Sequence, residues 1–196
     1  TKKITINIPT NWEDITIGMY QQYLSIVESN KSDEQKNIDI IKIFCNISDE
    51  NIKKISIEDI KYFTEKISGF LNKKEKFNLQ KVVNFKNKKY GFIPNLNKIT
   101  TGEYVDIETY SKDSNKNLHK IISVLYREVE NQKNEFYNIK SYDPDEFTEQ
   151  EFKDFPMSYT LAAIDFFFVL GQNLLADLNN YLMAVKKKQG KGALLP

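Results

Sequence analysis

A short pattern that begins helices occurs five times in this chain of 196 residues. Each copy has an apolar residue, then Ser or Thr, then three residues and a second apolar residue. The hydroxyl caps free backbone N–H groups of the first helical turn, and the apolar pair packs across that turn. The pattern therefore predicts a mainly helical chain with several short helices. The five capping residues are Thr16, Ser48, Ser56, Thr100 and Thr148.

Two of the five copies carry a further signal. Glu103 and Glu151 stand three residues after Thr100 and Thr148, where an acid completes a capping box. Apolar residues at helical spacing predict two more helices, one over 38–45 and one over 118–129.

A change of period predicts strands. Residues 82–93 place apolar residues on both sides of Lys86-Asn87-Lys88-Lys89, which indicates a β-hairpin with Asn87 in the turn. Strict alternation over residues 3–8 predicts another short strand, so a small three-stranded sheet is expected. Residues 131–147 are polar and acidic, and we expect a loop there. The fold class is then mainly α (α+β).

The C-terminal part predicts one long helix. From Leu161 to Val185 apolar residues recur at alternating spacings of three and four, a pattern typical of a helix packed along a seam. Asp165 and Asp177 interrupt this run too closely for a membrane span, which needs about 20 apolar residues. We expect residues 1–185 to form a single helical domain with a hairpin near 82–93, and residues 186–196 to form an extended C-terminal arm.

Charge gives little attraction to nucleic acid or to anionic membranes, because the formal net charge is only +1. The charges are unevenly spread: residues 30–98 have an excess of basic side chains, and residues 99–185 have an excess of acidic ones. We expect these segments to pair within the chain; the alternative is that they orient neighbouring copies head to tail. The basic segment keeps weak DNA binding open as an alternative.

The sequence has no recognisable catalytic or cofactor motif. The single histidine, His119, lies beside an apolar helical stripe, and the single cysteine, Cys45, lies on one, so both are interpreted as structural. Asp143, Asp145 and Glu146 lack the spacing of a calcium loop, and an Asp-Pro turn explains them better. We expect no enzyme activity, no cofactor, no metal and no small-molecule substrate.

Three segments carry a resemblance to a known class of proteins. They are Trp12-Glu-Asp-Ile-Thr-Ile-Gly-Met-Tyr20, Ile43-Phe-Cys-Asn-Ile-Ser48 and the hairpin Phe85-Lys-Asn-Lys-Lys-Tyr-Gly-Phe92. Their combination resembles small virion-assembly proteins of tailed phages, including crAss-like and other phages of Bacteroides-type hosts. Such proteins are tail assembly chaperones or neck and tail components. The resemblance implies a non-enzymatic role, but it carries no site residue with it.

We therefore expect a phage structural or assembly protein of the neck, tail or internal cargo, found in the virion and assembled in the host cytoplasm. Its partners would be other phage structural proteins, and we expect a homo-oligomer or part of a larger assembly. The alternatives are a tail assembly chaperone absent from the mature virion and a DNA-processing factor. In the cluster of three phenylalanines at 166–168, one ring must leave a one-sided core face. The expected partner-binding residues are Phe166, Lys186, Lys187, Lys188, Lys191, Leu194 and Leu195.

Overall fold

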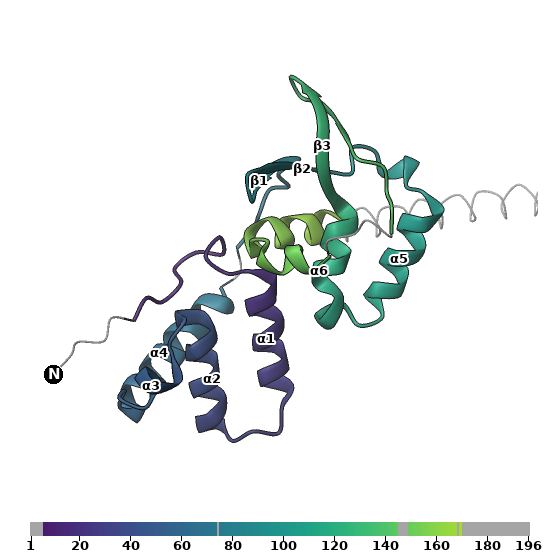
Figure 1. Cartoon of the computed structure of the whole chain (residues 1–196). Helices are drawn as coiled ribbons and strands as arrows, with labels where there is room; N and C mark the ends of the chain where they lie inside the picture. Colours follow the sequence, from purple (N-terminus) through teal and green to yellow (C-terminus); the bar gives the residue numbers. More distant parts are fainter. Residues whose placement is uncertain (1–5, 74, 145–148, 168, 170–196) are drawn as a thin grey trace, which may run out of the picture.

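Helices and an antiparallel sheet together form an α+β fold, as the sequence predicts (Figure 1). The computed structural model describes residues 6–73, 75–144, 149–167 and 169. The first helices gather at one end of the molecule, and the sheet lies at the other. Residues 157–167 form the last described helix, which runs between them.

Four helices form the N-terminal part of the molecule. They are α1 (Ile17–Glu28), α2 (Asp33–Cys45), α3 (Asp49–Ile52) and α4 (Ile57–Leu71). Helix α2 packs against both α1 and α4. The apolar faces meet at Ile17, Ile41, Phe44, Ile60 and Ile67, all of which are buried.

The predicted caps are confirmed at all four positions that the structure describes. The side chains of Thr16, Ser48 and Ser56 each accept a hydrogen bond from the backbone N–H three residues on. Thr100 and Glu103 form the full capping box, in which the Glu103 carboxylate also accepts from the Thr100 N–H at 2.6 Å. Thr148 lies outside the described residues.

The sheet has four antiparallel strands in the order β1-β2-β3-β4. The first two, β1 (Val82–Phe85) and β2 (Lys88–Phe92), form the predicted hairpin. Both turn residues have positive φ, 47° at Lys86 and 62° at Asn87, as the two central residues of a type I′ turn require. The prediction of Asn87 in the turn is therefore confirmed.

The other two strands correct three expectations. Residues 131–147 are not all loop, because β3 (Tyr126–Lys133) and β4 (Phe136–Ile139) form a second hairpin. The preceding helix, α6 (Ser114–Leu125), ends before Val129, which pairs in β3 instead. The sheet has four strands rather than three and gains none from the N-terminus: residues 6–8 form no strand, and residues 1–5 lie outside the described part.

Helices α5 (Thr101–Ser111) and α6 flank the sheet, and α6 continues directly into β3. A short 3-10 helix, η1 (Leu96–Lys98), links β2 to α5. Helix α6 packs against α1 and α5, so it connects the N-terminal helices to the sheet. Seven of the eight positions from 118 to 125 on α6 are buried, all but Lys120, which explains the central place of this helix. The buried residues are Leu118, His119, Ile121, Ile122, Ser123, Val124 and Leu125.

An aromatic cluster joins the sheet to the C-terminal part of the described chain. A 3-10 helix, η2 (Glu149–Asp154), brings Phe152 and then Phe155 against one face of the sheet. The Phe155 ring lies 5.1 Å from that of Phe85 and 5.4 Å from that of Tyr126. Phe152 packs edge-on against Tyr90 at 5.4 Å. These contacts form the core between the sheet and the helix over residues 157–167.

Backbone hydrogen bonds tie the start of the chain to this last helix. The Ile17 N–H donates to the Phe155 carbonyl at 3.0 Å, and the Met157 N–H donates to the Ile15 carbonyl at 2.8 Å. The Ser158 N–H also donates to the Trp12 carbonyl, at 3.2 Å. We call residues 12–17 and 155–158 the terminal clasp. The predicted long helix beyond residue 169, with its expected buried Leu175 and Leu178, lies outside the described residues, as does the arm at 186–196.

Candidate interaction surface

Phe166 is the one predicted partner-binding residue that the structure describes. It lies on the helix over residues 157–167, and 42% of its surface is exposed. Its ring meets the buried ring of Phe92 edge to face, with centroids 5.7 Å apart. One side of Phe166 is thus anchored on the end of β2, and the other side is open to a partner.

A groove of about 460 Å³ opens beside this ring. Its walls come from the segment before β1, the end of β2, η1, the β3–β4 hairpin and the last described helix. The lining is mostly apolar or aromatic, with Lys81, Glu135 and two asparagines at polar positions. The apolar and aromatic lining residues are Leu79, Phe92, Ile93, Pro94, Leu96, Phe136, Tyr137 and Phe166.

The tip of the β3–β4 hairpin supplies a second exposed ring. Phe136 is the first residue of β4 and is 83% exposed, the largest exposed fraction among the large hydrophobic residues of the described part. A phenylalanine in solvent exposes apolar area whose removal from water is worth about 25 cal/mol per Å², before the entropic costs of association are subtracted. Phe136 and Phe166 therefore give the groove an apolar residue from each of two separate elements.

Tyr137 fixes this hairpin to the sheet. Its hydroxyl donates to the Phe92 carbonyl at 2.7 Å, and burial raises the pKa of the phenol to about 12. Its ring and the Ile139 side chain lie against Gly91, where an added Cβ would approach them to 2.6 and 2.7 Å. The glycine allows this close approach, so the hairpin is held over the end of β2.

Sequence reasoning missed Phe136, because it assigned residues 131–147 to a loop. The available signal was weak: Phe136, Tyr137 and Ile139 are strand formers that follow an Asn-Glu turn, and Asn134 has the positive φ of 55° that such turns favour.

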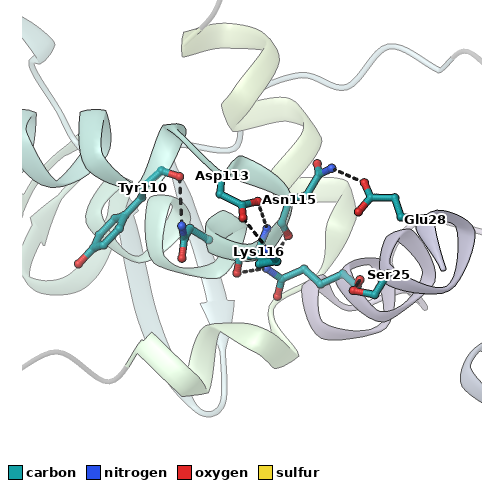
Figure 2. Close-up of polar contacts among 8 residues, drawn as sticks. Ser25, Glu28, Tyr110, Asp113, Asn115 and Lys116 are labelled. Atoms are coloured by element: carbon teal, nitrogen blue, oxygen red, sulfur yellow. Dashed lines mark hydrogen bonds and ion pairs between the residues drawn. The ribbon is translucent and has the colours of Figure 1, made fainter. Parts of the chain in front are cut away.

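A larger hollow of about 940 Å³ lies between α1, α2 and the start of α6. Figure 2 shows the polar contacts that link its walls. The Gln21 amide donates to the carbonyls of Asn115 and Lys116 at 2.9 and 2.7 Å, and the Asn115 amide donates to Glu28 at 3.2 Å. Lys116 pairs with Asp113 at 2.9 Å. These hydrogen bonds join α1 to the start of α6, so the polar groups of this wall serve the packing of the two helices.

The opposite wall of the hollow is also internally paired. Lys31 binds Asp39 at 2.6 Å, and Lys42 binds Asp49 at 2.5 Å. For Asp39, desolvation is the largest single effect and raises the pKa, but the hydrogen bonds from Lys31 and Gln35 and the nearby lysine charges together lower it below its usual value. For Asp49, the hydrogen bond and charge of Lys42 lower the pKa. Three of the four lysines that line this hollow, Lys31, Lys42 and Lys116, are therefore paired with acids of the chain itself.

A buried ionic cluster joins α5 to β3. Arg127 forms an ion pair with Glu103, and the two side chains are 12% and 3% exposed, respectively. The Arg127 guanidinium lies 5.7 Å from the centre of the Tyr142 ring. The Tyr142 hydroxyl donates to Asp106. Burial, followed by this hydrogen bond and the Asp106 charge, raises the pKa of Tyr142. The cluster docks α5 and the segment after β4 onto the sheet.

The single histidine and the single cysteine, His119 and Cys45, both pack into the protein. His119 is buried on α6. The Cys45 thiol is half-buried, and that burial raises its pKa to about 11, which suppresses the reactive thiolate. Among the described residues, no group of three His, Cys, Asp or Glu side chains is arranged to hold a metal ion. Likewise, the described helices include none with the length and hydrophobicity of a membrane span.

The basic β1–β2 hairpin is largely paired within the chain. Lys86 binds Asp154 at 2.7 Å, and Lys88 binds Glu128 at 3.3 Å. Both pairs join the basic segment 30–98 to the acidic segment 99–185, so these two segments pair within the chain at these positions. The remaining predicted site residues, Lys186, Lys187, Lys188, Lys191, Leu194 and Leu195, lie outside the described part of the chain.

Comparisons with known protein families, with curated proteins and with solved structures returned no match to this chain.

Proposed function

We propose that this chain is a non-enzymatic structural or assembly protein of a tailed phage, acting in the neck, tail or internal cargo through protein–protein contacts. The resemblance of residues 12–20, 43–48 and 85–92 to small virion-assembly proteins gives the biological setting. The structural observation that supports binding is the apolar groove between Phe136 and Phe166. Two exposed aromatic rings beside a preformed groove are the kind of feature that anchors protein interfaces.

The C-terminal part would extend this surface. We propose that the helix continues beyond residue 169 through the seam that ends at Val185, and that residues 186–196 form an extended arm. Lys186, Lys187, Lys188 and Lys191 would complement an acidic partner surface, and Leu194 and Leu195 would add an apolar anchor.

A second candidate is a tail assembly chaperone that leaves before the virion is complete. The same groove serves it equally well, because a chaperone also binds structural subunits. A DNA-processing role has less support, since Lys86 and Lys88 on the basic hairpin are already paired with acids.

Mass spectrometry of purified virions separates these roles. A structural component is expected in mature particles at a level comparable with that of other neck or tail proteins. Presence in infected lysate together with absence from particles would favour the chaperone instead. Absence of any complex with phage proteins in either sample would contradict both.

A variant series connects the function to the surface. Phe136→Ser should reduce incorporation into particles while leaving the circular dichroism and melting temperature unchanged, because the ring is 83% exposed. Ile57→Ser is the matched control, since Ile57 is also highly exposed but lies at the start of α4, in the N-terminal helical part. Equal incorporation of both variants would show that the groove does not bind the partner.

A further inference from the structure

The groove beside Phe166 lies where the described chain ends, and this position limits what can fill it. The last described helix passes the groove at Phe166, and Val169 shortly after it is 49% exposed. The chain then continues to Pro196. A long apolar segment is thus covalently attached next to an apolar groove, and the two are available to each other in every copy of the protein.

The sequence of that segment matches what such a groove accepts. Leu174, Leu175, Leu178 and Leu182 recur at helical spacing, with Asp177 as the single charge between residues 170 and 185. An isolated amphipathic helix of this length is marginal in water and gains its stability by burying its apolar face. Laying such a face into a hydrophobic groove through residues at i, i+3, i+4 and i+7 is a common mode of recognition.

We infer that residues 170–185 of a second copy of this chain occupy the groove between Phe136 and Phe166, so that two copies exchange their C-terminal segments in a symmetric dimer. The inference rests on the proposed function in that it names a partner for the same surface.

Sequence continuity favours the second copy over the same chain. The seam spacing runs from Leu161 through Gly171 to Val185 without a proline, so the sequence predicts one helix. One uninterrupted helix cannot fold back onto a groove at its own base, because reversing direction needs a turn. The same segment from a neighbouring copy meets no such constraint, and a two-fold axis lets each copy fill the groove of the other.

Charge at the groove agrees with this occupant. Lys81 lines the groove beside the hairpin, and Asp177 lies in the middle of the leucine row. The hairpin adds exposed Glu130 and Glu135, which suit the lysines that follow residue 185. These opposite charges would set the direction in which the helix lies rather than supply most of the affinity.

The first test is the oligomeric state of the full chain by light scattering after size-exclusion chromatography, over a range of concentrations. We expect a dimer whose dissociation constant rises at least about tenfold in Phe136→Glu, since placing a charge in an apolar contact costs more than 1.4 kcal/mol. Tyr62→Glu is the control, because Tyr62 is exposed on α4, which packs against α2 rather than the sheet. A monomer at all concentrations, or a dimer that Phe136→Glu leaves unchanged, would overturn the inference.

Disulfide trapping identifies the occupant directly. On a Cys45→Ser background, one batch of chains carries Phe136→Cys and a second, affinity-tagged batch carries Leu174→Cys. Mixing and mild oxidation should yield a crosslinked pair that contains one chain of each kind. A Tyr62→Cys batch mixed with the same Leu174→Cys chains should not crosslink. A chain carrying both Phe136→Cys and Leu174→Cys that crosslinks only to itself would show packing within one chain and would refute the exchange.

These results are separable from the fate of the proposed function. Dimerisation and crosslinking are measured on purified protein, whereas the phage role is measured by virion mass spectrometry. A trapped dimer that is absent from both particles and phage complexes would keep the inference and refute the function. Incorporation of a monomeric protein into particles would support the proposed function and refute the dimer inference.

Discussion

At the scale of single residues, the Glu103–Arg127 pair is the contact whose loss we expect to cost most. Glu103 is buried and Arg127 is only 12% exposed, and Glu103 also accepts a hydrogen bond from the Thr100 N–H in the capping box. Glu103→Gln keeps an oxygen for that cap but leaves the Arg127 charge without its counter-ion. Breaking a buried pair in this way costs about 3–5 kcal/mol.

Urea denaturation should therefore show a large fall in the free energy of unfolding for Glu103→Gln. Glu108→Gln on the same helix serves as the control, because Glu108 is exposed and should change stability by less than about 0.5 kcal/mol. Similar midpoints for the two variants would mean that the ion pair contributes nothing to stability.

Cys45 gives a pH-dependent prediction at the same scale. Burial raises the pKa of its thiol from 9.0 to about 11, so folding favours the protonated form. Between these values the unfolded chain loses the proton first, and stability should fall as pH rises from about 9 to about 11. At pH 8 the thiolate fraction is about a hundredfold lower than in an unshifted thiol. Alkylation of native protein should be correspondingly slower than in urea, and equal rates would contradict the burial.

At the scale of elements, two glycines should respond in opposite directions to the same substitution. A Cβ added at Gly91 on β2 would lie only 2.6 Å from the Tyr137 ring. The hydrogen bond from the Tyr137 hydroxyl to the Phe92 carbonyl holds that ring in place. Gly91→Ala should therefore destabilise the protein by about 1–3 kcal/mol through overpacking. Gly69 lies in α4 with no atom within 4 Å of the added group. Gly69→Ala should stabilise it by about 0.5–1 kcal/mol. Thermal melts that shift the same way in both variants would refute this account.

The helix caps give a further element-scale prediction. Ser56 accepts from the Asp59 N–H at 3.0 Å at the start of α4, and its hydroxyl donates to the Asp59 carboxylate at 2.7 Å. Ser56→Ala should lower the free energy of unfolding by about 1 kcal/mol, whereas Ser56→Asn should retain most of the stability because Asn also caps. If Asn behaves like Ala in urea melts, the cap is not what stabilises the start of this helix.

The elements also show how far sequence reasoning reaches. Helix caps and the β1–β2 turn depend on a few neighbouring residues, so Thr16, Ser56 and Asn87 were predicted correctly. The β3–β4 hairpin was missed because burial falls along β3 from Tyr126 to the exposed residues near its end, which leaves no apolar alternation to recognise. For the candidate site, Phe166 was predicted from the crowding of three phenylalanines. Phe136 and the groove were not, because they depend on packing between distant segments.

At the scale of the whole molecule, internal charge pairing predicts weak DNA binding. Lys86 and Lys88 already form ion pairs with acids from the other segment, and the net charge is only +1. Any phosphate-driven binding should fall steeply with salt. Filter or mobility-shift assays should show sequence-independent binding that is lost between 50 and about 200 mM salt. Tight binding that persists at the higher salt would favour the DNA-processing alternative.

Removing the arm is the second whole-molecule prediction. Truncation after Val185 should leave the circular dichroism and the melting temperature close to those of the full chain, because an arm rich in lysine and glycine adds little to a hydrophobic core. Incorporation into particles should fall, since the proposed arm is lost. Equal incorporation would eliminate the arm as a binding element, and loss of the fold would mean that the arm belongs to the core.

The terminal clasp has a consequence for the order in which the chain can fold during synthesis. Ile15 and Ile17 leave the ribosome long before their backbone partners, Met157 and Phe155. Helix α1 therefore gains these bonds at its first turn only after the chain has been made past residue 157. Contacts between such distant positions slow folding, because a long loop must close before they form. In nascent chains that stop before residue 155, proteases should still cleave within α1. Protection of α1 from cleavage should appear in one step, once the chain extends past residue 158.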